Sequence, residues 1–432
     1  MPPVEFEKYK VKDLILSHMS GPSPTCEERQ IASAEEWGLL KTTAVTWGGW
    51  DWTAHKVPPK CFWGKSNLEV QSGDVVVTKA GPRHRVGVVA YVDYTPPRIM
   101  VSGKMIGLRP DPEKVEYRIL AGALSQFGPQ RYLDNRTTGM ADSQLNFTNE
   151  LLLNTEVELP PFPEQTKIAE ILSMVDRAIE QTEALIAKQQ RIKTGLMQDL
   201  LTKGIDEHGN LRAEATHKFK DSPLGRIPVE WETETFEKTT PKDAPIGYGI
   251  VQPGQYDYTG IRVAGIYTIN SEFQRWHMSS RTIEQAYSRS RIQPGDVLLS
   301  IKGTTGRVGV VPVGYTGNIS RELARIRPAD NINPYFLRFL MLSDFFQRYL
   351  DNAEVGTTRA EISIKILRQL FVLIPPENEQ QEIVKRIELV EESIRNGEHE
   401  LRKVKLLKTG LMQDLLTGRK RVTPLLEPAT TD

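Results

Sequence analysis

The chain has little of what would assign it to several large classes of protein. Its 432 residues include only two cysteines, Cys26 and Cys61, which excludes a disulfide framework and a cysteine-based zinc site. No apolar run approaches the roughly 18 residues that a membrane helix needs, and nothing has the pattern of a secretory signal. These absences predict a protein of the reducing cytoplasm with no membrane partner.

The chain also lacks net charge, because 55 basic residues face 55 acidic ones. This balance argues against a histone-like protein that binds nucleic acid through bulk positive charge. It leaves open a DNA-binding protein whose basic residues gather on one face. It equally allows a protein whose partner supplies part of the phosphate contacts.

Motifs that would supply chemistry are missing as well. The nearest string to the N/D-P-P-Y/F motif of amino-methyltransferases is Asn333–Phe336, which lacks the second proline. Gly64-Lys65-Ser66 lacks the upstream glycine of a P-loop, and no G-x-G-x-x-G follows a predicted strand. The seven histidines show no zinc spacing. We therefore expect no active site, metal or cofactor. An enzyme with an unrecognised site stays open, and would show methyl transfer or cleavage when purified alone.

What the sequence does contain is an internal repeat. The ten residues Lys193–Thr202 recur without a change at Lys408–Thr417, 215 positions later. Upstream of each copy, apolar residues step by four and three alternately, from Ile168 in the first copy and from Ile383 in the second. That heptad seam predicts two helices of about 38 residues, each roughly 55 Å long. Their apolar stripes are most simply buried against each other, with Gly397 as a weaker point.

A second repeat links the segments that precede these helices. Gln71–Val77 matches Gln293–Leu299 at an offset of 222, which would place Gly81, Arg85, Gly87 and Val89 on Gly303, Arg307, Gly309 and Val311. Gln130–Asn135 likewise matches Gln347–Asn352. The sequence is thus a tandem duplication of an α/β (α+β) domain and a long helix. We expect a β-hairpin over 70–77 and 85–91, and a helix over 333–350.

The repeats divide the chain into six segments. They are a first domain over 1–159, a helical spacer over 160–204, an exposed linker over 205–220, a second domain over 221–374, a second spacer over 375–418, and a flexible tail over 419–432.

These features together resemble the specificity subunit of type I restriction-modification systems. The resemblance is carried by PPFPEQ…GLMQDLLTKG and PPENEQQEI…GLMQDLLTGR, by Asp221–Pro228 followed by Trp231, and by Pro294–Leu298 with Lys302-Gly303 and Gly306. The first domain departs from the family pattern. It lacks the D-S-P-L-G start, residues 1–20 have no clear counterpart in the second half, and Ala80–Arg85 stands where the second domain has Lys302–Arg307.

The resemblance implies two target recognition domains separated by helical spacers that pair antiparallel, with a pseudo-twofold relation. It implies a non-catalytic chain that binds an asymmetric, bipartite site in double-stranded DNA. It also implies two methyltransferase subunits as partners, joined in some systems by restriction (translocase and nuclease) subunits. The alternative is a stand-alone sequence-specific DNA-binding protein or regulator, whose helix pair only connects domains. Such a protein would bind its site tightly without a methyltransferase.

Basic and glycine-rich loops are the candidate DNA contacts. Arginine can grip guanine O6 and N7 together, while threonine and backbone N–H groups suit phosphates. In the first domain the candidates are Lys79, Arg83, His84, Arg85, Arg131, Arg136, Thr137 and Thr138. In the second domain they are Arg275, Arg281, Arg289, Arg291, Lys302, Thr304, Thr305, Arg307, Arg348, Thr357, Thr358 and Arg359. Two alternatives stay open: these arginines are ordinary surface residues, and the glycines only serve a tight hairpin.

The unchanged repeat itself predicts a surface for a partner. Packing alone would tolerate exchanges among Leu, Ile and Val, yet polar positions are repeated too. We therefore expect one methyltransferase subunit to contact each copy. The candidate residues are Lys193, Leu196, Gln198, Asp199, Lys408, Leu411, Gln413 and Asp414. The alternative is that recent duplication accounts for the identity.

Overall fold

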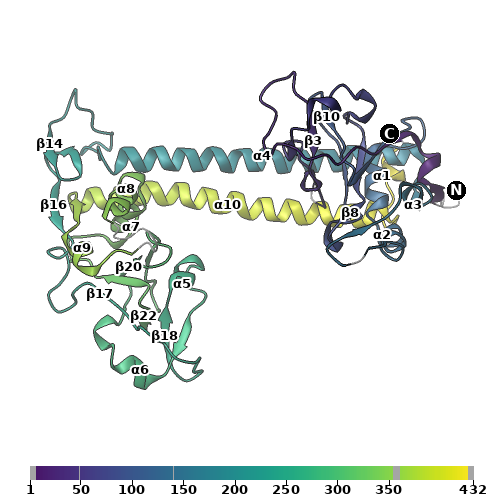
Figure 1. The fold of residues 1–432 in the computed structure, drawn as a ribbon. Coiled ribbons are helices and arrows are strands. Elements are labelled where there is room, and N and C mark those ends of the chain that lie inside the picture. Colours follow the sequence, from purple (N-terminus) through teal and green to yellow (C-terminus); the bar gives the residue numbers. More distant parts are fainter. Residues whose placement is uncertain (1–5, 48, 140, 354–360, 427–432) are drawn as a thin grey trace. The chain divides into compact units, whose positions relative to one another are not determined.

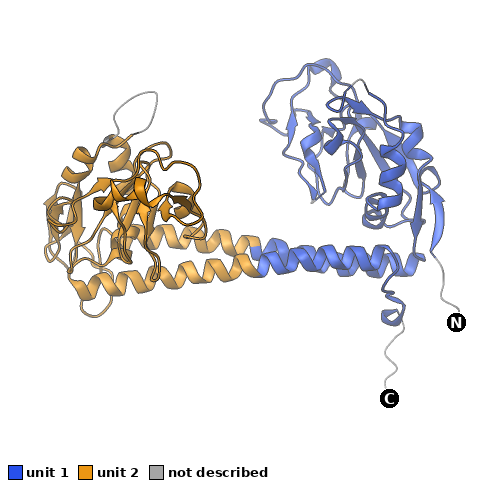
Figure 2. Cartoon of the chain, turned by 90° about the horizontal axis from the view of Figure 1, so that it is seen from below, with its two compact units in different colours: residues 1–182, 400–432 blue, residues 183–399 orange. Residues whose placement is uncertain are grey.

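The structure, a computed structural model, describes residues 6–47, 49–139, 141–353 and 361–426. The chain forms two compact units, coloured separately in Figure 2. Unit 1 holds residues 1–182 and 400–432, and unit 2 holds residues 183–399. Each unit contains one α/β domain together with part of both long helices. Within the described ranges, no helix has the length and apolar character needed to cross a membrane.

A four-stranded antiparallel sheet forms the centre of the first domain. Its strands, in spatial order, are β2 (Ile15–Met19), β11 (Met105–Pro110), β7 (Val75–Thr78) and β9 (Val89–Tyr91). Strand β7 is buried on both faces: Val75 and Val77 belong to the core beside α1 (Tyr117–Leu124), and Val76 to the core on the opposite face. A continuous β-branched run fits such a strand. The predicted hairpin is confirmed as β7 and β9.

A smaller sheet packs on the face that carries Val76. It contains β10 (Ile99–Met100), β3 (Gly38–Leu40) and β6 (His55–Lys56), with β10 parallel and β6 antiparallel to β3. At the edge of the domain, β1 (Glu7–Lys10) pairs with β13 (Glu156–Leu159). The other elements are β4 (Val45–Thr46), β5 (Gly49–Trp50), β8 (Ala80–Gly81), α2 (Phe127–Asp134), β12 (Leu145–Asn146) and α3 (Asn149–Leu153).

The second domain repeats this topology strand by strand. Its main sheet, in the same spatial order, has β17 (Gly247–Tyr248), β23 (Leu323–Ile326), β20 (Val297–Ser300) and β21 (Val308–Val310). Its smaller sheet has β22 (Asn318–Ile319) parallel and β19 (His277–Ser279) antiparallel to β18 (Ile261–Ala264). The counterparts of β1, β13, α1, α2 and α3 are β16 (Glu232–Thr235), β24 (Phe371–Ile374), α7 (Pro334–Leu342), α8 (Asp344–Ala353) and α9 (Ile364–Gln369). This unit also contains β14 (Phe219–Ser222), β15 (Gly225–Pro228), α5 (Ile266–Asn270) and α6 (Arg281–Gln285). The duplication is confirmed.

The structure corrects two details of the predicted repeat. The described part of the segment 1–20 does have a counterpart, because β1 and β2 occupy the places of β16 and β17. The single offset of 222 ends in the loop after β7. Val77 pairs with Val89, but Leu299 pairs with Val308, so the loop of the second domain is three residues shorter (77 to 89 against 299 to 308). Val89 therefore matches Val308, not Val311.

Buried polar contacts are repeated along with the strands. Asp74, at the turn before β7, accepts hydrogen bonds from Arg109 at 2.9 and 3.0 Å. Asp296 accepts from Arg327 in the same way, at 2.7 and 2.8 Å. Both carboxylates are 1% exposed, so each needs its arginine to offset the loss of water. This explains why the aspartate is repeated in the two matching segments.

The helix predicted over 333–350 is two helices, α7 and α8. Asn333 caps α7 by accepting from the backbone N–H groups of Tyr335 and Phe336. Ser343 adopts extended dihedrals (φ −69°, ψ 147°) and ends α7. Its hydroxyl then accepts from the N–H of Phe346 at 3.4 Å, as an N-cap of α8. A serine that can cap is therefore enough to break an apolar run with good helical spacing.

Two long helices, α4 (Phe162–Leu200) and α10 (Glu377–Leu416), run side by side (Figure 1) and confirm the predicted spacers. Their pairing is antiparallel within each unit. In unit 2, Gln189 donates to Ser393 at 2.7 Å, and an added Cβ on Gly397 would lie 3.0 Å from Ile186. Gly397 therefore gives Ile186 room to enter the seam.

Described residues of the predicted linker and tail make buried contacts that were not predicted. Arg212, in the predicted exposed linker, is 7% exposed and donates to Glu379 at 2.6 and 3.0 Å. In the predicted flexible tail, Arg421 pairs with Glu164 at the start of α4, and Val422 is buried. These two glutamates are 215 positions apart. Each spacer helix therefore begins with a glutamate that holds the chain following the other helix.

Candidate nucleic-acid interface

The predicted DNA contacts in the loop after β7 are of two kinds, exposed residues and residues with internal partners. Arg83 and His84 are exposed, in a short 3-10 turn over residues 83–85. Arg83 pairs with Asp134 at 2.6 Å and with Asp142 at 3.3 Å. Both are surface ion pairs, which water screens and which a phosphate could replace. Arg83 and His84 are thus placed where a duplex could reach them.

The other two predicted residues of this loop have internal partners. Arg85 donates to the backbone carbonyls of Thr42 and Val45, the latter at 3.1 Å. Lys79 is half-buried and donates to Asn149 at 2.9 Å, and burial lowers the pKa of its ammonium. These contacts tie the loop to the rest of the domain. Arg85 and Lys79 therefore stabilise the conformation of the loop, and they contribute less to its exposed surface.

The matching loop of the second domain, residues 301–307, is shorter. Thr304 and Arg307 are exposed and Thr305 is half-buried, while Lys302 pairs with Glu361 at 2.9 Å. The backbone N–H of Arg307 donates to the hydroxyl of Ser300 at 2.7 Å, while its side chain is exposed. Of these residues, Arg307 and Thr304 are the most accessible to a ligand.

Glycines in both loops serve the turn. Gly87 and Gly306 have φ values of +82° and +79°, the left-handed region that favours glycine. An added Cβ would lie 2.9 Å from Gln130 Oε1 at Gly87 and 2.3 Å from Gln347 Oε1 at Gly306. The two glutamines in turn donate to the carbonyl oxygens of these glycines. Gly87 therefore matches Gly306, and the hairpin interpretation holds for this pair.

Four arginines that precede β20 in the second domain were also predicted to contact DNA. Arg291 forms a bidentate pair with the buried carboxylate of Glu284, at 2.7 and 2.9 Å. That hydrogen bonding lowers the pKa of Glu284, so Arg291 has a structural partner. Arg275, Arg281 and Arg289 are exposed. Arg281 is the first residue of α6, whose N-terminus Ser280 caps.

The predicted cluster before each spacer helix is only partly described. Arg131 and Arg136 are exposed on and after α2, where they lie over Phe127 and Tyr132 at 5.7 and 4.1 Å. Thr137 donates to the carbonyl of Asp134, and Thr138 makes a two-way backbone bridge with Asn146. Arg348 is exposed on α8. Thr357, Thr358 and Arg359 lie outside the described residues.

Sequence reasoning missed an aromatic surface in the second domain. Tyr258 is 88% exposed and contacts Tyr256, which in turn contacts His277, at ring-centre distances of 4.9 and 5.5 Å. Arg262 lies over Trp276 at 4.4 Å. Aromatic side chains beside arginines are typical of nucleic-acid surfaces. The available signal was the pair Tyr256 and Tyr258, which are separated by one residue and lie just after Pro253-Gly254.

The repeated segment of the long helices has two faces. Lys193 and Lys408 point into the helix pair, where they bind Glu391 and Asp176 at 2.6 and 2.7 Å. Gln198 and Gln413 are exposed, while Leu196, Leu411, Asp199 and Asp414 are half-buried. A structural role therefore accounts for the repeated lysines. The repeated glutamines remain accessible to a partner.

A groove borders the first copy of this segment. It has a volume of about 570 Å³ and is lined by Lys193, Met197 and Gln198 of α4, by Phe345 and Arg348 of α8, and by Ile394 of α10. Exposed apolar side chains follow the same duplication. Met174 and Leu389 are 53% and 59% exposed, and Ile192 and Leu407 are 50% and 55% exposed. Each pair is 215 positions apart.

Comparison with known proteins agrees with this architecture. The type I restriction modification DNA specificity domain family matches residues 62–189 and 238–406. The EcoBI specificity subunit of Escherichia coli is 30% identical over 252 residues, which are 56% of this chain and 53% of that protein. The putative MjaX specificity subunit of Methanocaldococcus jannaschii is 26% identical over 352 residues, which are 81% of this chain and 79% of that protein. The chain thus spans only about half the length of the first of these relatives.

Two solved structures share the fold. One is a chain from work on complex assembly and conformational transition of the type I R-M system, with a TM-score of 0.56, 18% identity, and coverage of 96% of this chain and 98% of that one. The other is the S subunit of a type I restriction-modification system from M. genitalium, with a TM-score of 0.54, 14% identity, and coverage of 96% and 97%. At these identities the likeness concerns the fold alone.

Proposed function

The chain belongs to the type I restriction-modification DNA specificity family, and we propose that it recognises one asymmetric, bipartite sequence in double-stranded DNA. In this proposal each α/β domain binds one half of the sequence. The two half-sequences differ because the two sets of loops differ. The chain contributes no catalytic group, and a partner methyltransferase performs the chemistry on DNA that this chain has selected.

One observation carries the proposal: the scaffold of the two domains is duplicated while the outer loops are not. The buried pairs Asp74–Arg109 and Asp296–Arg327 are repeated, as are the paired glutamine contacts behind each loop. The exposed loops share almost nothing, since Arg83 and His84 stand on one and Thr304 and Arg307 on the other. Sequence is recognised by groups that reach base edges, so diverged loops on a common scaffold suit two unlike half-sites.

The surface of the long helices supports two copies of one partner. Gln198 and Gln413 are exposed at equivalent positions, as are the apolar pairs Met174 and Leu389, and Ile192 and Leu407. Packing within the chain does not account for these repeated apolar residues, because their side chains are exposed to solvent. Exposed apolar side chains that recur on a surface are typical of an interaction site. We propose that one methyltransferase subunit docks on each copy. Restriction subunits would join through the resulting complex.

Expression of this chain with a methyltransferase subunit in a methylation-free host tests the proposal. Long-read sequencing of the genomic DNA reports every methylated site. The expected result is methylation at one bipartite motif, with two unlike half-sequences separated by a fixed number of unspecified base pairs. Methylation that is absent or follows no motif would overturn the proposal. So would methyl transfer or cleavage by this chain alone. Tight, specific binding by the isolated chain, unchanged by the methyltransferase, would favour a stand-alone regulator.

A further inference from the structure

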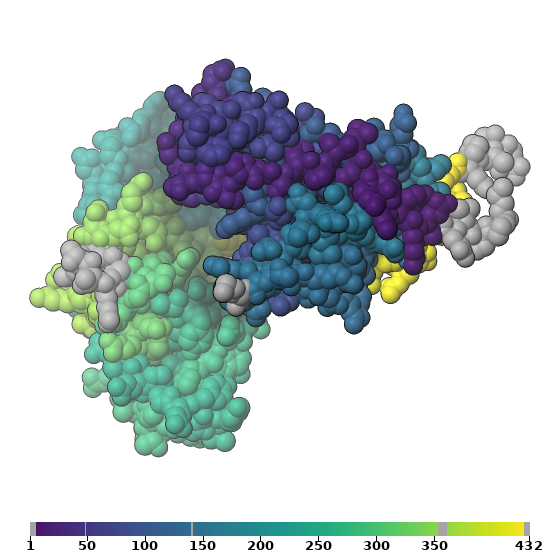
Figure 3. Space-filling view, turned by 45° about the vertical axis from the view of Figure 1, so that its right-hand side comes forward, coloured from purple at the N-terminus to yellow at the C-terminus, as the bar shows by residue number. Residues whose placement is uncertain are grey.

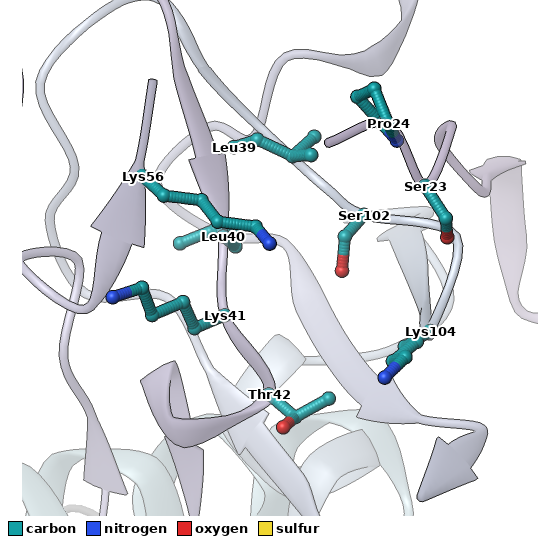
Figure 4. Close-up of a pocket in the computed structure, with 9 residues that line it drawn as sticks. All are labelled: Ser23, Pro24, Leu39, Leu40, Lys41, Thr42, Lys56, Ser102 and Lys104. Atoms are coloured by element: carbon teal, nitrogen blue, oxygen red, sulfur yellow. The ribbon is translucent and has the colours of Figure 1, made fainter. Parts of the chain in front are cut away.

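A basic pocket lies in the first domain, outside the loop that the sequence singled out (Figure 4). Its volume is about 290 Å³. The polar lining consists of three lysines and three hydroxyl groups: Lys41, Lys56, Lys104, Ser23, Thr42 and Ser102. In Figure 4 the polar ends of Lys56 and Ser102 point toward a common space, while Lys41 directs its ammonium away from it. Among the described residues, no acidic side chain lines the pocket.

The charge of the pocket is only partly balanced. Glu28 lies 2.6 Å from the ammonium of Lys41 and 3.7 Å from that of Lys56. The hydrogen bond with Lys41 holds the pKa of Glu28 below its usual range, so this carboxylate is charged at neutral pH. Lys104 is exposed and pairs with no carboxylate in the described part of the chain. One negative charge therefore faces three positive ones.

The pocket is joined to the predicted DNA loop by backbone hydrogen bonds. The carbonyl of Lys104 accepts from the N–H of Lys79 at 2.9 Å, and the carbonyl of Thr42 accepts from the guanidinium of Arg85. Two residues that line the pocket, Thr42 and Lys104, thus hold the two ends of the loop that presents Arg83 and His84. Figure 3 shows the purple N-terminal residues and the blue residues near position 100 and beyond on one face of this domain.

The second domain has the same strands here but not the same side chains. The register of β3 with β10 matches that of β18 with β22, which aligns Lys41 and Thr42 with Ile266 and Tyr267. Lys104 precedes β11 as Glu322 precedes β23. A lysine in one domain and a glutamate in the other, on one scaffold, is not a requirement of folding. The two domains therefore present different charges at this position.

We propose that this pocket binds a backbone phosphate of the DNA at the first domain, an inference that rests on the proposed function. Lys56 and Lys104 supply the positive charge, and the hydroxyls of Ser102 and Thr42 donate to phosphate oxygens. Ammonium groups and hydroxyls are the usual partners of phosphates in protein–DNA contacts, and they position the duplex without selecting bases. A DNA strand bound through this phosphate would lie in one fixed position along the domain. Arg83 and His84, on the adjacent loop, would then reach the edges of the same bases each time.

The test uses the full chain bound to its methyltransferase, with two fluorescent duplexes. One duplex contains the motif that methylome sequencing identifies. The other duplex contains a shuffled sequence of the same length. Dissociation constants are measured by anisotropy between 50 and 200 mM salt for the wild type and for Lys56→Gln/Lys104→Gln. The charge-matched control is Lys8→Gln/Lys12→Gln. These two lysines precede β2, whose first residue, Ile15, pairs with Pro110 at the end of β11. Lys104 precedes the other end of β11.

Removing one phosphate contact lowers the slope of log affinity against log salt by about 1. The affinity lost between 50 and 200 mM salt should therefore be about 4-fold smaller in the pocket variant than in the wild type. Both duplexes should weaken by a similar factor. Lys104→Gln alone should show a smaller change of the same kind, and Lys56→Arg/Lys104→Arg should restore wild-type binding. Unchanged unfolding temperatures establish that the variants fold.

A pocket variant with the wild-type slope, or one no different from the Lys8/Lys12 control, would overturn the phosphate site and leave the proposed function standing. A loss confined to the motif duplex would also overturn it, since that result indicates base recognition. If the wild-type complex does not prefer the motif over the shuffled duplex, it is the proposed function that fails.

Discussion

Lys193 on α4 donates a hydrogen bond to Glu391 on α10 across 2.6 Å, and the contact recurs between Lys408 and Asp176 at 2.7 Å. Lysines 193 and 408 are 215 positions apart, and so are the two acids. Duplication has therefore copied one interhelix ion pair into each unit. Polar residues at seam positions specify register and partner at some cost in stability. Here they favour one antiparallel register over a slip by one heptad.

Replacing Glu391 should destabilise the helix pair in unit 2. Glu391 also accepts from Arg338 at 3.3 Å, so Glu391→Ala leaves two half-buried cations without their counter-charge. Because the pairs are only partly buried, we expect a loss of about 1–3 kcal/mol in the free energy of unfolding. Thermal unfolding and faster hydrogen exchange in residues 186–200 would report it. Glu392→Ala, at the exposed neighbouring position, is the matched control and should change little.

The same carboxylate predicts a pH dependence. Burial alone would raise the pKa of Glu391, but the charges of Arg338 and Lys193 outweigh it and hold the pKa below its ordinary value of 4.5. A carboxylate with a depressed folded-state pKa stabilises the protein above the unfolded-state pKa and loses that contribution as pH falls through the folded-state value. The stability gap between wild type and Glu391→Gln should therefore shrink below about pH 4.5. An equal gap at pH 3 and pH 7 would contradict this assignment.

The spacer helices could be predicted from the sequence because the heptad spacing of apolar residues is a local signal. The duplication could be predicted because segments of the sequence recur at a fixed offset. The sequence could not predict the break at Ser343, since apolar spacing continues through it and only the capping hydroxyl reveals it. Nor could it assign Arg212 to a buried pair, because its partner Glu379 lies 167 residues away. The same limit applies to the DNA surface. Arg85 and Arg291 look like Arg83 and Arg281 in sequence, and only the backbone carbonyls beside Arg85 and the buried Glu284 beside Arg291 show that they have structural partners.

Arg212 should therefore matter for stability although it lies in a segment that resembles a linker. Glu379 is 6% exposed, and Arg212→Ala would leave its carboxylate buried without a counter-charge. We expect a loss of about 3–5 kcal/mol in the stability of unit 2. Arg226→Ala, which removes an exposed arginine paired with Glu214, should cost less than about 1 kcal/mol. A double variant, Arg212→Met/Glu379→Leu, should recover most of the loss, as seen in the unfolding temperature. Equal effects of Arg212→Ala and Arg226→Ala would show that the buried pair contributes nothing special.

Two arginines of the second domain should separate DNA binding from stability. Arg307→Gln removes an exposed side chain of the loop after β20 and should weaken binding at one half-site by about 5- to 150-fold, the range of one bidentate base contact. Its unfolding temperature should not change. Arg291→Gln should instead lower the unfolding temperature, because it breaks the pair with buried Glu284. Binding and melting curves of both variants check this. If Arg291→Gln weakened DNA binding without any change in melting, the assignment of these two residues would be reversed.

The length of the spacer helices should determine the number of unspecified base pairs in the motif. Four residues inserted between Ala187 and Lys188 lengthen α4 by about 6 Å, close to the rise of two base pairs. A four-residue insertion is a stutter that a coiled coil absorbs by local unwinding, so the seams on either side of it can be kept. We expect methylome sequencing to show a changed spacer with both half-sequences unaltered, because neither set of loops is touched. The same four residues inserted after His208, outside both helices, should leave the spacer as it was. An unchanged spacer in the helix variant would mean that the distance between the half-sites is set by something other than these helices.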